Sequence, residues 1–122
     1  MDNTNVPRLI KVIGIIVIVI TLMQILQLDK AINAEICRKK AREADKMGNY
    51  TVVIEEYQKV LNYYPNYTFG RSRIALAQLK NGDYVNAAQT LKMLKGKNID
   101  KRTADEINYI VMKLQGEITN GH

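Results

Sequence analysis

The chain has 122 residues, a formal net charge of +6, 47% hydrophobic residues and 25% charged residues. That length allows one small domain rather than two. A single cysteine excludes an intrachain disulfide framework and a cysteine-rich zinc site. The only histidine is the last residue, His122, so a histidine-based catalytic centre is not expected.

The apolar residues are concentrated near the N-terminus. Residues 9–28 carry a single charge, on Lys11, close to one end. Twenty helical residues span about 30 Å, which is the thickness of the hydrocarbon core of a bilayer. The rest of the chain is too small to cover such a helix on every side. The sequence therefore predicts a single transmembrane helix over residues 9–28, after an N-terminal tail of residues 1–8.

A cleaved signal peptide is the alternative for this segment. The residues that follow it contain no pair of small residues at the distance that cleavage needs, so an uncleaved signal anchor is the better prediction. Two basic residues, Arg8 and Lys11, lie at the front of the segment, and a basic cluster at 38–42 follows it. By the positive-inside rule this distribution slightly favours the cytoplasmic side for the C-terminal domain. Folded domains also cross membranes regardless of charge, so the side stays open.

One face of the predicted transmembrane helix carries small and polar residues, namely Gly14, Thr21 and Gln24. Small residues let two helices approach closely, and a glutamine in hydrocarbon forms hydrogen bonds with a neighbouring helix. We therefore expect these three residues to contact another membrane helix. The alternative is that Gln24 lies near the interface and is hydrated.

The sequence after the apolar segment contains an internal repeat with an offset of 34 residues. Gly48-Asn-Tyr50 aligns with Gly82-Asp-Tyr84, and Ala41 aligns with Ala75. Glycine at the end of a helix accepts the left-handed conformation that a tight turn needs. Proline cannot continue a helix, so Pro65 is expected to end the second helix of the first unit. The repeat therefore predicts two helical hairpins.

The spacing of apolar residues predicts where these helices lie. Their approximate bounds are 29 or 32 to 47, 50–64, 68–80, 84–94 and a last helix at 103–118. The alanines among the inward-facing residues should allow close helix crossing. The inward-facing residues are predicted to be Cys37, Ala41, Ala44, Val53, Ile54, Tyr57, Val60, Leu61, Ile74, Ala75, Gln78, Leu79, Ala87, Ala88, Leu91, Leu94, Ile107, Ile110, Val111 and Leu114.

A 34-residue period with a Gly-polar-Tyr turn resembles the tetratricopeptide repeat family. The resemblance covers two repeats, at about 34–67 and 68–101, and a capping helix at about 103–118. It implies an all-α fold in which the single transmembrane helix is followed, over residues 29–122, by an array of antiparallel helical hairpins.

The basic run Arg38-Lys-Lys-Ala-Arg42 is the most prominent functional feature. In the tetratricopeptide repeat family the first helix of each repeat lines a groove, so the resemblance implies a basic, partly apolar groove suited to an acidic or C-terminal peptide. The alternatives for the basic run are anionic lipid headgroups and a solvated helix face. The groove positions that the resemblance implies are Arg38, Lys39, Arg42, Asp45, Lys46, Phe69, Ser72, Arg73, Leu76, Leu79 and Lys80. The residues expected to bind a partner are Arg38, Lys39, Arg42, Lys46, Arg73 and Lys80.

Catalytic patterns are missing from the sequence. It contains no phosphate-binding loop and no nucleophile with a neighbouring base, and we expect no enzymatic activity, cofactor, metal site or small-molecule substrate. The pair Glu55-Glu56 is predicted to lie on a solvated helix face, and Cys37 is predicted to act as a small packing residue. Nucleic-acid binding is not expected, because aromatic residues are not interleaved with the basic ones.

These features predict a non-enzymatic, membrane-anchored accessory or assembly subunit of a larger membrane protein complex. Its partners would be other protein subunits and the lipid bilayer. The first alternative is an anchored receptor that binds acidic or targeting peptides in the groove. The second is a cofactor-carrying subunit, for which the sequence offers no ligand motif.

Overall fold

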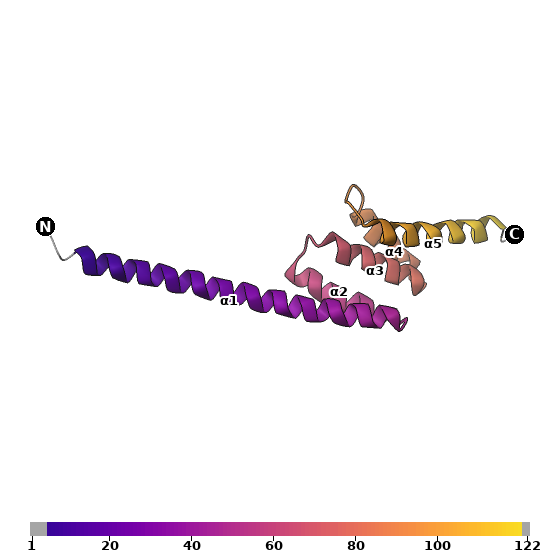
Figure 1. The fold of residues 1–122 in the computed structure, drawn as a ribbon. Coiled ribbons are helices and arrows are strands. Elements are labelled where there is room, and N and C mark those ends of the chain that lie inside the picture. The colour runs from indigo at the N-terminus through magenta and orange to yellow at the C-terminus, as the bar shows by residue number, and fades with distance from the viewer. Residues whose placement is uncertain (1–4, 121–122) are drawn as a thin grey trace. The chain divides into compact units, whose positions relative to one another are not determined.

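The computed structural model describes the backbone of residues 5–120 and the side chains of residues 5–116. Over these residues the chain forms five helices and no strand, so the all-α prediction is confirmed for them (Figure 1). The chain divides between Asn33 and Ala34 into two compact units. The helices are α1 (Asn5–Lys46), α2 (Tyr50–Tyr63), α3 (Thr68–Lys80), α4 (Tyr84–Met93) and α5 (Lys101–Asn120).

The apolar segment and the first repeat helix belong to one helix, α1. The sequence suggested a new helix beginning at Asp29 or Ile32, but α1 has no interruption there. The reason is that no glycine or proline lies between Gly14 and Gly48, so no residue in that stretch breaks a helix.

The first unit holds the apolar segment. An 18-residue window of α1 has a mean hydropathy of 2.7 and none of it is buried, so the helix is long and apolar enough to cross a membrane. The large apolar side chains from Leu9 to Leu28 are 49–70% exposed. Of the predicted tail, residues 5–8 are already helical, and residues 1–4 lie outside the described part of the chain.

In the second unit the same helix-ending turn occurs twice, 34 residues apart. Gly48 and Gly82 have φ angles of 72° and 78°, in the left-handed region that favours glycine. In both turns the residue after the glycine donates its backbone N–H to a carbonyl five positions back, at 2.9 Å. This is the hydrogen bond of a Schellman helix end. The predicted role of the two glycines is therefore confirmed.

The end of α2 also follows the prediction. Tyr64 has φ −130° and ψ 82°, outside the helical region that proline disfavours for the residue before it. Pro65 then opens the loop that leads to α3, and the helix ends at Tyr63.

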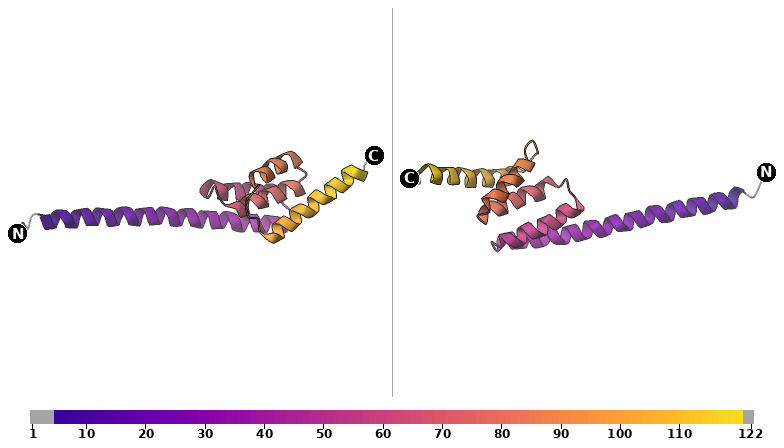
Figure 2. Two further views of the ribbon diagram at one scale, coloured as in Figure 1. Left: turned by 90° about the horizontal axis from the view of Figure 1, so that it is seen from above. Right: turned by 180° about the vertical axis from the view of Figure 1, so that it is seen from behind.

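Helix α3 lies between the other helices of the second unit and has buried residues on several sides (Figure 2). One core cluster joins α3 to α1 and α2, and a second joins α3 to α4 and α5. The buried members of the first cluster are Ala41, Ala44, Val53, Tyr57, Leu61, Ile74 and Ala77. Those of the second are Leu76, Leu79, Ala87 and Ile107.

Some of the predicted inward-facing residues are not buried. Ala88 is exposed, because α4 buries only Ala87 and its other sides face solvent. Half-buried positions are found mainly on α4 and α5, the last helices of the chain, where the described residues offer no further helix to cover them. The half-buried residues are Cys37, Ile54, Gln78, Leu91, Ile110, Val111 and Leu114.

The contrast between two adjacent alanines of α4 gives a test of this packing. Ala87 is 0% exposed, so Ala87→Leu should overpack the second cluster and lower the free energy of unfolding by about 1–3 kcal/mol. Ala88→Leu, at the exposed neighbour, should change it by no more than about 0.5 kcal/mol. Thermal unfolding followed by circular dichroism in detergent measures both. Equal losses for the two variants would contradict the placement of α4.

Candidate partner-binding site

A hollow of about 410 Å³ lies in the second unit, where α1, α2 and α3 meet the start of α5. We call it the central hollow. Its residues come from four segments of the sequence. They are Arg42, Asp45, Lys46, Tyr57, Phe69, Arg73, Asp100, Arg102 and Thr103.

Three of the six residues expected to bind a partner line the central hollow, namely Arg42, Lys46 and Arg73. Two of the additional groove positions, Asp45 and Phe69, also line it.

The other three expected residues lie on different surfaces. Arg38 lies beside the loop between α2 and α3, and Lys39 lies on a surface formed by α1 and the start of α2. Lys80 borders a separate hollow next to α5. The structure therefore divides the predicted basic groove into separate surfaces.

Three of the groove positions that the resemblance implied do not line the central hollow. Ser72, Leu76 and Leu79 are buried in the domain. The reason is that α3 is covered from two sides, so residues that one hairpin would expose are enclosed by α4 and α5.

Arg73 acts as a cross-link between three helices. Its side chain is only 13% exposed and forms a salt bridge with Asp45 of α1. Toward α5, its Nη1 donates a hydrogen bond to Thr103 Oγ1 at 3.4 Å and lies 3.9 Å from a carboxylate oxygen of Glu106. A guanidinium held in this way has little capacity left for a partner, so its role is to hold α1, α3 and α5 together.

Most of the other predicted cations also have acidic neighbours within the chain. Glu35 lies 3.0 Å from Arg38 and 3.2 Å from Arg42. Lys80 lies 3.2 Å from Glu106, and Lys46 lies 3.7 Å from Glu43. For Lys39, the described residues include no ionic partner. Internal pairing therefore neutralises much of the charge that the sequence assigned to the groove.

Aromatic rings contribute an apolar surface to the central hollow. Phe69 is 38% exposed. It meets Tyr57 edge-on, with ring centroids 6.2 Å apart, and it meets Tyr67 at 5.9 Å. The hollow therefore combines an exposed aromatic ring with basic side chains at its rim.

The start of α5 supplies lining residues that the sequence reasoning missed. Arg102 is 88% exposed at the rim of the hollow. Asp100 accepts hydrogen bonds from the backbone N–H and the hydroxyl of Thr103, at 3.0 and 2.9 Å. Burial raises the pKa of Asp100, but these two bonds outweigh it and hold the pKa below its usual value. The Asp-x-x-Thr spacing is a helix-capping pattern, and it was the signal in the sequence for this helix start.

Glu56 does not lie on a solvated face, so that prediction is wrong. It is 6% exposed, and its Oε1 accepts a hydrogen bond from Lys59 Nζ at 2.9 Å. Burial raises the pKa of Glu56, but Lys59 and the thiol of Cys37 favour the charged form and bring the pKa below its usual value. Oε2 is buried without an aligned hydrogen-bond partner among the described residues. The preceding residue, Glu55, is exposed as predicted.

Cys37 faces this carboxylate from α1 and is half-buried. Desolvation and the negative charge of Glu56 raise the pKa of the Cys37 thiol, so the thiol stays protonated at neutral pH. Within residues 5–116, no group of three or more histidine, cysteine or acidic side chains is arranged to hold a metal ion.

The three residues expected to contact a membrane helix are all exposed on α1. Thr21 donates its hydroxyl to the backbone carbonyl of Val17 at 2.8 Å, so this group is satisfied within its own helix. A Cβ added at Gly14 would meet no atom within 4 Å. Gln24 has no hydrogen-bond partner among the described residues.

No family model, no curated protein and no solved structure matches this chain.

The cross-linking role of Arg73 predicts a difference between two arginines of the central hollow. Arg73→Gln leaves Asp45 without its ionic partner, removes the contacts of Arg73 with Thr103 and Glu106, and should lower the free energy of unfolding by about 2 kcal/mol. Arg42→Gln removes an exposed ion pair and should cost less than about 1 kcal/mol. Denaturant unfolding in detergent measures both. A smaller loss for Arg73→Gln than for Arg42→Gln would refute the cross-link.

The buried carboxylate predicts an acid-sensitive contribution to stability. Because the pKa of Glu56 is lower in the folded state, its contribution is complete above the pKa in the unfolded chain and is lost as the pH falls through the folded value. Between about pH 5 and pH 3, the free energy of unfolding should therefore fall less steeply for Glu56→Gln than for the unaltered chain. Glu55→Gln removes the same charge at an exposed position and is the matched control. If the free energy of unfolding of Glu56→Gln depends on pH as steeply as that of the unaltered chain, the stabilising role of the Glu56 carboxylate is contradicted.

Proposed function

We propose that this chain is a non-enzymatic, single-pass membrane protein whose second unit docks another subunit of a membrane complex. The observation that supports it most is the exposure of the apolar side chains of residues 9–28. In a bilayer these side chains face lipid. Leaving each large apolar side chain in water instead costs about 1.5–3 kcal/mol relative to burying it.

The second unit is proposed to be a tetratricopeptide-like array of two hairpins and a capping helix. Supporting observations are the recurrence of the same glycine turn after 34 residues and the packing of successive helices on α3. Such arrays bind other polypeptides on the surface that several helices build together. The central hollow is the matching surface in this chain.

The chemistry of the central hollow favours a segment that carries both acidic and apolar side chains. Phe69 offers an exposed ring, and Arg42, Lys46 and Arg102 surround it with basic groups. Arg102 has the most exposed side chain of these three cations, at 88%, compared with 74% for Lys46 and 54% for Arg42. Arg102 and Phe69 are therefore proposed as the main contacts.

The membrane segment is proposed to pack against a partner helix through Gly14, Thr21 and Gln24. The Gln24 amide should contribute most to this helix–helix contact, because an amide without a partner in hydrocarbon gains about 1 kcal/mol or more from an interhelical hydrogen bond. The basic residues that follow the segment slightly favour the cytoplasmic side for the second unit.

A receptor for acidic or targeting peptides is the second candidate. The same exposed ring and basic rim support it, and it differs in the partner, which would be a transient peptide instead of a resident subunit. Stoichiometric recovery of one protein in mild detergent favours the subunit. Weak, salt-sensitive binding of isolated peptides, lost in Arg102→Glu, favours the receptor.

The test is co-purification in mild detergent with two matched charge reversals. Arg102→Glu reverses a charge at the rim of the central hollow, and Lys39→Glu reverses one on a different surface. Arg102→Glu should reduce recovery of the partner about ten-fold or more, as expected for an introduced like-charge contact, while Lys39→Glu leaves it unchanged. Recovery of the chain alone, or equal effects of the two variants, would overturn the proposal.

A further inference from the structure

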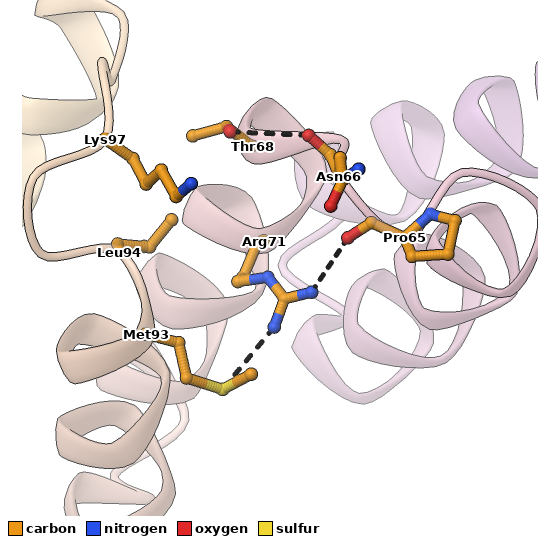
Figure 3. A pocket seen from close by; sticks show the side chains of 7 residues that line it. All are labelled: Pro65, Asn66, Thr68, Arg71, Met93, Leu94 and Lys97. Carbon is orange, nitrogen blue, oxygen red and sulfur yellow. Dashed lines mark hydrogen bonds between the residues drawn. The ribbon is translucent and has the colours of Figure 1, made fainter.

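The loops that lead into α3 and α5 lie at the same end of the second unit. Arg71 joins them: its Nη2 donates to the carbonyl of Pro65 at 3.0 Å, and its Nη1 donates to the sulfur of Met93 at 3.4 Å (Figure 3). A hollow of about 220 Å³ between the loops is lined by Arg71 and Lys97, together with Asn66 and Thr68. Figure 3 shows Lys97 reaching toward the space that Arg71 borders.

A second, more open hollow of about 500 Å³ shares Pro65 and Asn66 with the first. Its other residues are Arg38 and the tyrosines at 63, 64 and 67. Arg38 lies over the ring of Tyr67, 5.5 Å from its centroid. We call the continuous surface formed by the two hollows and the exposed lysines 95 and 97 the loop edge.

The cations of the loop edge differ from those of the central hollow in their partners. In the central hollow, Arg42 and Arg73 face carboxylates of the same chain, and on the loop edge Arg38 faces Glu35. For Arg71, Lys95 and Lys97, the described residues contain no acidic partner within salt-bridge distance. The loop edge therefore carries three cations that no described carboxylate compensates, as Lys39 and Lys113 are on other surfaces.

The loop edge lies where the chain enters the second unit. This unit begins at Ala34, and Arg38, one helical turn later, touches the loop before α3. Whatever the orientation of the two units, the six residues from Leu28 to Ala34 cannot span more than about 20 Å. A bilayer that holds residues 9–28 is therefore close to the loop edge.

We infer that the loop edge contacts the anionic headgroups of the bilayer that holds the apolar segment. Arg71 and Lys97 offer donors to a headgroup phosphate, and tyrosines favour the headgroup level because an apolar ring carries a polar hydroxyl. This inference rests on the membrane anchoring proposed above. It assigns lipid contact to a surface different from the one that binds the partner.

The experiment uses the full chain in nanodiscs and exploits the absence of tryptophan. Asn66→Trp places a single fluorophore on the loop edge, and Asn81→Trp places one at the opposite end, at the turn after α3. A lipid with a nitroxide on its headgroup quenches fluorescence at the membrane surface. In nanodiscs rich in phosphatidylserine, Asn66→Trp should be quenched at least about twice as strongly as Asn81→Trp, and the difference should shrink at high salt.

A pair of charge variants separates lipid attraction from an effect of the new tryptophan. Each basic side chain near an anionic surface strengthens binding about five-fold, so Lys95→Gln with Lys97→Gln should remove most of the quenching of Asn66→Trp. Lys46→Gln with Lys113→Gln removes the same charge outside the loop edge and should leave the quenching unchanged.

The outcomes distinguish this inference from the proposed function. If the chain enters the nanodiscs but the two reporters are quenched equally, or quenching does not depend on phosphatidylserine, the lipid contact is refuted and the loop edge is left to solvent or to a protein partner. If the chain does not enter the nanodiscs at all, the membrane anchoring fails and the lipid contact fails with it.

Discussion

The apolar side chains of residues 9–28 need an environment that excludes water, and the described part of the chain buries none of this segment. Burying these side chains is worth several tens of kcal/mol in total, against the roughly 5–15 kcal/mol that stabilises a typical domain. A protein with so much uncovered apolar surface aggregates in water unless lipid or another protein covers it. This requirement limits what can surround the chain, because either lipid or another protein has to cover the segment.

The charges of the second unit divide into two groups with different roles. Arg73, Asp45 and Glu106 compensate one another between α1, α3 and α5, and this network gives the central hollow its shape. Arg71, Lys95 and Lys97 of the loop edge have no acidic partner within salt-bridge distance among the described residues, so their field extends into solvent and attracts anionic surfaces. The net charge of +6 therefore combines charged groups that are paired between helices with basic side chains that face solvent.

Local sequence signals predicted much of the fold, while the site depended on tertiary contacts. Gly48, Gly82 and Pro65 determine where helices end through their own backbone preferences, so their roles could be predicted without a structure. The burial of Glu56 and the pairing of Arg73 could not, because each involves a side chain of α1, namely Cys37 and Asp45. The continuity of α1 was missed for a different reason: the change from apolar to charged residues near Asp29 looks like a boundary, but a helix ends only where its backbone is interrupted.

Alkaline carbonate extraction of membranes that contain the full chain tests the central claim most directly, because it releases proteins held by charge and retains those held by buried apolar segments. The account predicts that the chain stays in the membrane pellet at full length. It also predicts that replacing Val17, Ile18 and Val19 with arginines releases the chain, since each arginine at the centre of a membrane helix costs about 3 kcal/mol. Release of the unaltered chain into the carbonate supernatant would contradict the account.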